Sequence, residues 1–200
     1  MAVYTKINRS DLLSINRKFN FENFQSFKGI KQGIENTNYL LRSKNKKFIL
    51  TIFEKRVLKK EIPFFIKLMD QLSNLNFNCP KPLKNYRGDY LIKVKNKTAC
   101  VVTFLNGKDK KKLNLKNCFD IGKTIAQIHL STKKLKLYRK NSMGIKNLNP
   151  LLNSIKFKSQ KFSNLEKFLK NNFKDIKDKW PKKLPQVIIH GDLFIDNIFF

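Results

Sequence analysis

The sequence predicts an α+β fold in two parts, a five-stranded antiparallel sheet with one helix, followed by a helical region. Short apolar runs separated by turn residues occupy most of the first half of the chain. Apolar residues at spacings of three and four dominate the second half. Hydrophobic residues make up 41% of the 200-residue chain and include 18 Phe, which is enough to form a core and excludes an intrinsically disordered basic tail.

Three strands are expected first, as a small antiparallel meander. The apolar runs Phe24–Ile30 and Thr37–Ser43 indicate the first two strands, and the segment between them is rich in turn residues. The run Lys47–Phe53 (KFILTIF) indicates the third strand. The segment that joins the first two strands is therefore expected to form a hairpin that carries glycine.

One helix is expected after the third strand, where the apolar spacing changes. From Glu61 to about Asn76, apolar residues recur every three or four positions. Pro63 falls in the first turn of this helix, where proline is tolerated. Two more strands, Asp89–Lys95 and Thr98–Leu105, are expected next and complete the sheet.

The rest of the chain is expected to be helical until a final loop. Two amphipathic helices are indicated by the apolar sets Cys118, Ile121, Ile125 and Ile128, and Leu165, Phe168, Leu169, Phe173 and Ile176. A strand-like run, Val187–Ile189, then leads into the segment His190–Asn197. Ile198–Phe200 is expected to begin a returning strand.

This order of elements is that of a bilobal, protein-kinase-like fold. Residues 1–105 are expected to form its nucleotide-binding N-lobe. Residues 106–200 are expected to form an incomplete helical C-lobe that ends just after the segment His190–Asn197. A short hinge around residues 104–107 would connect the two lobes.

The segment His190-x-Asp192-x-x-x-x-Asn197 has the spacing of a kinase catalytic loop. Phosphoryl transfer needs a carboxylate that orients and deprotonates the attacking hydroxyl, and oxygen ligands that hold Mg²⁺ on the phosphates. We therefore expect Asp192 to be the catalytic base and Asn197 to bind Mg²⁺. His190 is expected to brace the loop through hydrogen bonds. The apolar runs on both sides of the motif argue against a chance match.

Two other segments are candidates for binding ATP. In the first hairpin, Gly29 and Gly33 would let backbone N–H groups approach the phosphates, while Asn36 and Asn38 shape the turn or donate hydrogen bonds. The same pattern also fits an ordinary hairpin that contains glycine. The backbone of Thr103–Leu105, at the predicted hinge, is a candidate to hydrogen-bond adenine, and a plain buried strand fits that segment equally well.

The chain is strongly basic, with 43 Lys and Arg against 14 Asp and Glu and a formal net charge of +29. A non-catalytic protein that binds nucleic acid is therefore an alternative. However, 37 of the basic residues are Lys and six are Arg, scattered along the chain, which is typical of an AT-rich coding sequence. We expect no specific nucleic-acid partner. Three Cys without a CxxC spacing, and no apolar leader or membrane-length run, predict a cytoplasmic protein without a membrane partner.

The whole sequence resembles the aminoglycoside phosphotransferase and choline kinase superfamily, and within it the bacterial homoserine kinases. The HGDxxxxN loop carries the first resemblance, and the strings MAVYTKINRSDL, IENTNYLL and FILTIFEKRV carry the second. The resemblance implies phosphorylation of the L-homoserine hydroxyl by ATP and Mg²⁺, giving O-phospho-L-homoserine in threonine biosynthesis. A choline or aminoglycoside kinase of the same superfamily is the alternative. The residues that bind the acceptor and the oligomeric state are left open.

Two departures from the superfamily pattern bear on activity. Relatives usually carry Lys or Arg on the third strand to hold the α- and β-phosphates, where this sequence has Thr51. Lys55, Arg56 and Arg42 are the candidates to replace that charge. The resemblance also implies a second metal-binding Asp beyond the catalytic loop, and the sequence stops before it. The chain therefore looks like a truncated kinase, and we expect the 200 residues alone to be poorly soluble and nearly inactive.

Overall fold

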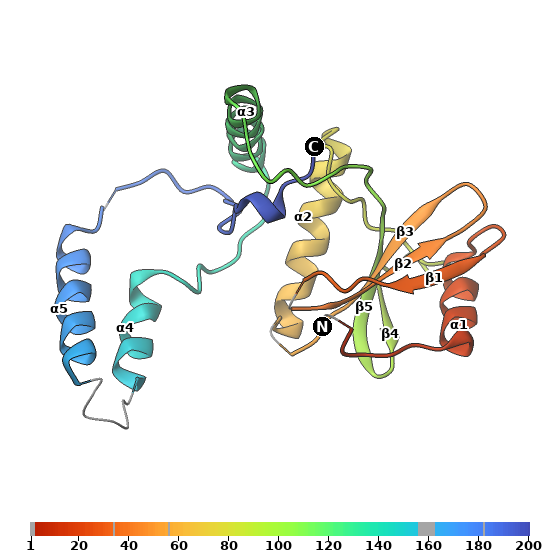
Figure 1. The fold of residues 1–200 in the computed structure, drawn as a ribbon, viewed down its shortest axis with the longest axis horizontal. Helices are drawn as coiled ribbons and strands as arrows, with labels where there is room; N and C mark the ends of the chain where they lie inside the picture. Colours follow the sequence, from red (N-terminus) through yellow and green to blue (C-terminus); the bar gives the residue numbers. More distant parts are fainter. Residues whose placement is uncertain (1–2, 34, 56, 156–162, 182) are drawn as a thin grey trace. The chain divides into compact units, whose positions relative to one another are not determined.

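The computed structural model describes residues 3–33, 35–55, 57–155, 163–181 and 183–200. Its elements are α1 (Arg9–Phe19), β1 (Ser26–Gly29), β2 (Thr37–Arg42), β3 (Lys47–Ile52), η1 (Lys59–Glu61), α2 (Ile62–Asn74), β4 (Leu91–Val94), β5 (Lys97–Thr103), α3 (Leu115–Thr132), α4 (Ile145–Ser154), α5 (Ser163–Lys179) and η3 (Ile195–Asn197) (Figure 1). The chain divides into two compact units, Met1–Ile128 with His190–Phe200, and His129–Ile189. The lobe boundary at residue 105 stays a prediction.

The sheet has five strands in the order β1-β2-β3-β5-β4, and each neighbouring pair is antiparallel. The predicted α+β fold, with α2 following the third strand, is confirmed. The strands are shorter than the apolar runs that indicated them. For example, β5 ends at Thr103, which is paired with Phe48, while Leu105 lies beyond the sheet and is 37% exposed.

Each face of the sheet is covered by one helix, because successive strand residues point to opposite faces. Figure 1 shows α1 and α2 on opposite sides of the strands. The α1 side buries Leu12, Ile15, Leu41, Leu50 and Val101, and the α2 side buries Ile62, Ile66, Cys100 and Val102. Burial of a Leu or Ile side chain contributes about 2 kcal/mol, so these two clusters are the main stabilising feature of the sheet.

Helix α1 was not among the elements that the sequence predicted. Its start is fixed by a reciprocal capping box, in which the side chain of Asn8 accepts from the backbone N–H of Asp11 and the Asp11 carboxylate accepts from the backbone N–H of Asn8, both at 2.9 Å. Leu12 and Ile15 are its buried residues. The helix has only 11 residues, and the Asn-x-x-Asp spacing could have indicated where it begins.

The second half of the chain contains α3 and α5, which confirm the two helices predicted there, and α4, which was not predicted. Pro150 lies inside α4. A proline within a helix removes a backbone hydrogen bond and crowds the preceding turn, so this stretch did not resemble a helix in the sequence.

The two strands expected around the catalytic loop are wrong. Neither Val187–Ile189 nor Ile198–Phe200 forms a strand. Ile189 is 60% exposed and Phe199 is 67% exposed, and a strand requires a neighbouring strand to pair its backbone groups. Pairing is limited to two hydrogen bonds of 3.0 Å, in which Lys108 and Phe200 exchange backbone N–H and carbonyl groups.

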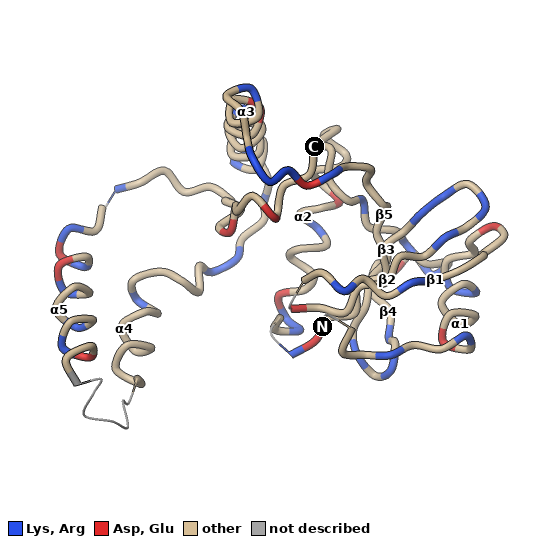
Figure 2. The backbone as a smooth tube through the Cα atoms, viewed as in Figure 1, with Lys and Arg blue, Asp and Glu red and all other residues tan. Residues whose placement is uncertain are grey.

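Basic residues occur throughout both units. Figure 2 shows Lys and Arg on helices, strands and connecting segments, without concentration along one element. This distribution matches the scatter noted in the sequence. Among the described residues, no helix is long and apolar enough to cross a membrane.

Candidate active site

The structure brings the three residues of the HGDxxxxN motif together. The side-chain amide nitrogen of Asn197 donates to the backbone carbonyl of Asp192 at 2.8 Å and to its Oδ2 at 3.0 Å. The backbone N–H of Asp192 donates to Nδ1 of His190 at 3.3 Å. Gly191 has φ of 78°, a conformation that favours glycine, and this turn allows His190 and Asp192 to meet.

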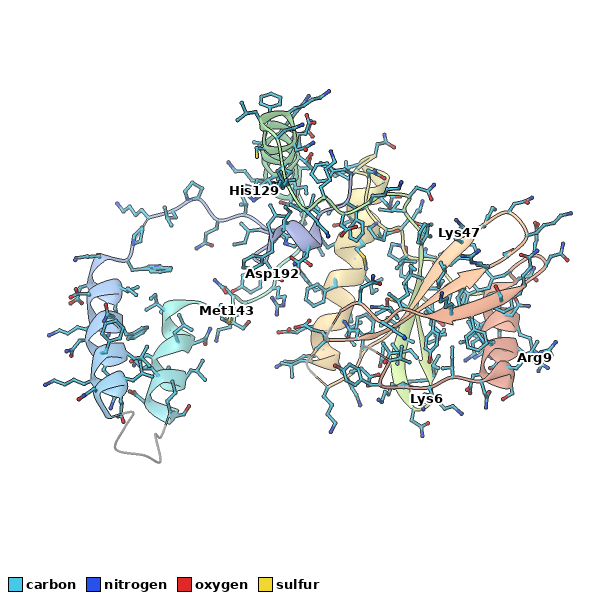
Figure 3. All side chains as sticks on the ribbon, in the orientation of Figure 1. Lys6, Arg9, Lys47, His129, Met143 and Asp192 are labelled. Carbon is cyan, nitrogen blue, oxygen red and sulfur yellow. The ribbon has the colours of Figure 1, made fainter. Side chains whose placement is uncertain are left out.

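The loop presents its functional groups at the surface of the described chain. Asp192 lies beside the short helix η3 (Figure 3), and both Asp192 and Asn197 are exposed. Asn197 uses its side-chain nitrogen to contact Asp192, and its side-chain oxygen is a potential metal ligand.

The pair has the donor chemistry that Mg²⁺ requires. Mg²⁺ binds oxygen, commonly through one or two side chains together with substrate phosphates and water. Among the residues that the structure describes, no group of three or more His, Cys, Asp or Glu side chains gathers into a metal site. The Asp192 carboxylate contacts the amide nitrogen of Asn197, and the Asn197 side-chain oxygen fits a metal that is shared with bound phosphates.

The glycine hairpin lies between β1 and β2. Gly33 has φ of 91°, and a β-carbon there would meet nothing within 4 Å. The side-chain oxygen of Asn36 accepts from the backbone N–H of Glu54 at 3.3 Å. The side-chain oxygen of Asn38 accepts from the hydroxyl of Thr51 at 2.8 Å. Both asparagines thus connect the start of β2 to the end of β3.

Arg42, Lys55 and Arg56 are the candidates to supply the positive charge that relatives carry at the position of Thr51. Asn38 is opposite Thr51 in the sheet, whereas Arg42 is opposite Lys47, so Arg42 lies about 13 Å along β2 from Asn38. Lys55 is exposed and follows the end of β3. Arg56 lies outside the described residues.

The predicted adenine segment is partly occupied by internal hydrogen bonds. Thr103 donates its backbone N–H to the carbonyl of Lys81 at 2.9 Å, and its hydroxyl accepts from the backbone N–H of Lys81 at 2.9 Å. Phe104 donates to the carbonyl of Lys47 at 3.2 Å. Leu105 lies just past these contacts, at the start of the connection to α3.

A polar cluster near the hairpin was missed by sequence reasoning. Oε1 of Glu54 accepts from the hydroxyls of Thr5 and Thr37, each at 2.7 Å, and the other carboxylate oxygen is paired with Lys97. We call Thr5, Thr37, Glu54 and Lys97 the Glu54 cluster. Its members are far apart in the sequence and share no spacing. The sequence signal was the presence of Thr5, Thr37 and Glu54 in the three strings that carry the family resemblance.

The charge of Glu54 is stabilised within this cluster. Burial raises the pKa of Glu54, but hydrogen bonds from Lys97, Thr5 and Thr37, with the positive charge of Lys97, outweigh burial and lower the pKa below its ordinary value. The Glu54 side chain is 8% exposed and that of Lys97 is 41% exposed. The carboxylate therefore stays ionised at neutral pH.

This chain is similar to known protein sequences over most of its length. The profile described as "Phosphotransferase enzyme family" matches residues 26–200. The chain is 33% identical over 201 residues to a homoserine kinase of Parvibaculum lavamentivorans, and 35% identical over 202 residues to a homoserine kinase of Bradyrhizobium diazoefficiens. These matches cover 100% of this chain but 63% and 62% of the two relatives, so it spans less than two thirds of their length.

Solved structures show the same fold. An amicoumacin kinase in complex with AMP-PNP, Ca²⁺ and Ami gives a TM-score of 0.75 at 15% identity, over 98% of this chain and 61% of that chain. A spectinomycin phosphotransferase in complex with ADP and spectinomycin gives 0.63 at 13% identity, over 98% and 66%. Together with the family profile, these likenesses confirm the resemblance seen in the sequence, and the chain belongs to the phosphotransferase enzyme family.

Proposed function

We propose that the complete natural protein transfers the γ-phosphoryl group of ATP to the hydroxyl of L-homoserine, a step of threonine biosynthesis in the cytoplasm. The observation that carries the proposal is the contact between Asp192 and Asn197 on the HGDxxxxN loop. The names of the similar curated proteins support homoserine as the acceptor.

The proposed chemistry places each loop residue in one role. The Asp192 carboxylate orients the acceptor hydroxyl and takes its proton as the bond to phosphorus forms. His190 holds the backbone of Asp192 through its ring nitrogen. Asn197, through its side-chain oxygen, would hold Mg²⁺, which when bound neutralises charge on the phosphates.

The glycine hairpin is assigned to the nucleotide in this proposal. Gly29 and Gly33, with Asn36 and Asn38 holding the start of β2, would bring backbone N–H groups to the ATP phosphates. The backbone around Leu105 would contact adenine, because Thr103 already donates its N–H to Lys81.

The acceptor is tested by comparing substrates on the complete natural protein. ADP release is measured with homoserine, choline and an aminoglycoside in parallel, and we expect turnover with homoserine alone. Turnover with choline or an aminoglycoside instead would retain the kinase and reject the acceptor. ADP release with none of the three would reject the proposed function.

The base is tested by Asp192→Asn, which keeps the side-chain shape and removes the charge. We expect kcat to fall by at least about 100-fold, as for the loss of a general base. Asp196→Asn is the matched control, because Asp196 is an exposed carboxylate of the same loop. Full activity of Asp192→Asn, or an equal loss in both variants, would contradict the assignment.

A further inference from the structure

The N-terminal segment Val3–Asn8 contacts both ends of the glycine hairpin. A β-carbon at Gly29, the last residue of β1, would lie 2.9 Å from Cγ2 of Val3, so the Val3 side chain fills the space beside this glycine. The hydroxyl of Thr37, the first residue of β2, accepts from the backbone N–H groups of Tyr4 at 2.9 Å and Thr5 at 3.1 Å. One segment therefore touches the residue before the hairpin and the residue after it.

The Glu54 cluster links that segment to two central strands of the sheet. Glu54 follows β3 and Lys97 begins β5, and these two residues form the ion pair of the cluster. Lys97 also donates to the hydroxyl of Thr5 at 2.7 Å. The backbone of Glu54 donates to Asn36, the residue before β2. The hydroxyls of Thr5 and Thr37 and the carboxylate of Glu54 thus connect the N-terminal segment to the ends of β2, β3 and β5.

The cluster contacts the end of the hairpin at Thr37 and also joins the end of β3 to the start of β5. The sheet is stabilised by the two apolar clusters, which contain none of the four residues of the Glu54 cluster. At the tip of the hairpin, a β-carbon on Gly33 would meet no atom within 4 Å. The position of the tip therefore depends on how firmly its two ends are held.

We propose that Thr5, Thr37, Glu54 and Lys97 are positioning residues for the nucleotide. They hold the ends of the glycine hairpin so that its backbone N–H groups meet the phosphates of ATP. The assignment of the hairpin to phosphates rests on the proposed function. In this proposal the cluster acts on nucleotide affinity through the hairpin.

The test compares two lysines that lie two residues apart. Lys97→Met breaks the ion pair with Glu54. Lys95→Met breaks an ion pair of 3.2 Å with Asp11, a residue of α1. The side chains are 41% and 46% exposed, so the two changes are closely matched. Both variants are made in the complete natural protein, and KM for ATP, KM for homoserine and kcat are measured.

We expect Lys97→Met to raise KM for ATP about tenfold and to leave KM for homoserine within twofold of the Lys95→Met value, because a small displacement of a binding group has a large effect on its ligand. Equal KM values for ATP in the two variants would overturn the proposal. If the unsubstituted protein releases no ADP with any acceptor, the proposed function is rejected. Equal KM values for ATP in an active enzyme would instead reject only the positioning role of the Glu54 cluster.

A second pair of variants applies if Lys97→Met does not fold. Thr37→Val removes the hydroxyl that joins Tyr4, Thr5 and Glu54, and Thr37→Ser keeps it. We expect Thr37→Val to raise KM for ATP and to speed hydrogen exchange in residues 30–33, and Thr37→Ser to restore both. Exchange in residues 30–33 of Thr37→Val that is as slow as in the unsubstituted protein, or an unchanged KM for ATP, would overturn the proposal.

Discussion

The two compact units differ in how far they bury their apolar side chains. In the first unit, the sheet buries apolar side chains on both faces, and Leu41, Leu50 and Val101 are fully enclosed. In the second unit, neither α4 nor the described side chains of α5 include a buried residue. Phe168 is among the large apolar side chains exposed there. Amphipathic periodicity therefore accounts for helices in both units, but a core forms only where a second layer covers the apolar face.

The largest expected difference concerns core leucines. Leu50→Ala, at the centre of β3, should lower the free energy of unfolding by about 3 kcal/mol, because it removes buried methyl groups and leaves a cavity. Leu151→Ala, at a site 58% exposed on α4, should change it by less than about 0.5 kcal/mol. Urea unfolding followed by circular dichroism measures both. Similar losses would contradict the contrast between the units.

A smaller effect is expected from the buried carboxylate of the first unit. Glu54→Gln should lower the free energy of unfolding by about 2 kcal/mol at pH 7, because hydrogen bonds to a charged group are lost. The pKa of Glu54 is lowered in the folded chain, so its contribution is complete above the unfolded pKa and disappears as pH falls through the folded pKa.

Because the pKa of Glu54 is lowered in the folded chain, the effect of Glu54→Gln should depend on pH. Acidification from pH 7 to below about 4 should bring the unfolding free energies of the unsubstituted chain and Glu54→Gln together. Urea titrations at a series of pH values follow the difference. A gap between the two proteins that widens in acid would show that the carboxylate is not stabilised as described.

The N-terminal cap of α1 should contribute less. Asn8→Ala removes one half of the capping box and should cost about 1 kcal/mol, while Asn8→Ser retains a capping oxygen and should cost only a fraction of that. Thermal unfolding of both variants makes the comparison. No loss in Asn8→Ala would mean that packing of Leu12 and Ile15 alone holds the helix.

The smallest effect is expected for a surface ion pair of the second unit. Lys170 and Glu166 lie four residues apart on α5 at 2.5 Å, with side chains 49% and 35% exposed. Lys170→Ala should change the unfolding free energy by no more than about 0.5 kcal/mol, and salt should reduce the change further. A loss as large as that of Glu54→Gln would remove the distinction between buried and surface ion pairs.

Much of the fold was predictable because strands and long helices leave a periodic pattern in the sequence. The five strands and α2 follow from alternation and from the change of spacing at Glu61. Helices α1 and α4 are amphipathic but short, with 11 and 10 residues, and Pro150 interrupts the sequence pattern of α4. The two strands expected on either side of the segment His190–Asn197 are absent because apolar composition cannot indicate whether a pairing partner exists.

The candidate site was predictable only where its residues are close in the sequence. His190, Asp192 and Asn197 lie within one loop, and their spacing alone indicated that they meet. The Glu54 cluster joins the N-terminal segment to β2, β3 and β5, so its contacts depend on tertiary structure. No spacing rule covers residues brought together in that way.

The return of the chain at its C-terminal end makes His129–Ile189 an insertion within the first unit. Segment His190–Phe200 belongs to the first unit, where the backbone of Phe200 pairs with that of Lys108. A β-carbon added at Gly107 would lie 3.0 Å from the β-carbon of Phe199, so the two residues are in close contact. The entropy of closing a loop rises only with the logarithm of its length. A change in the length of the inserted segment should therefore cost little in the attachment of His190–Phe200 to the first unit.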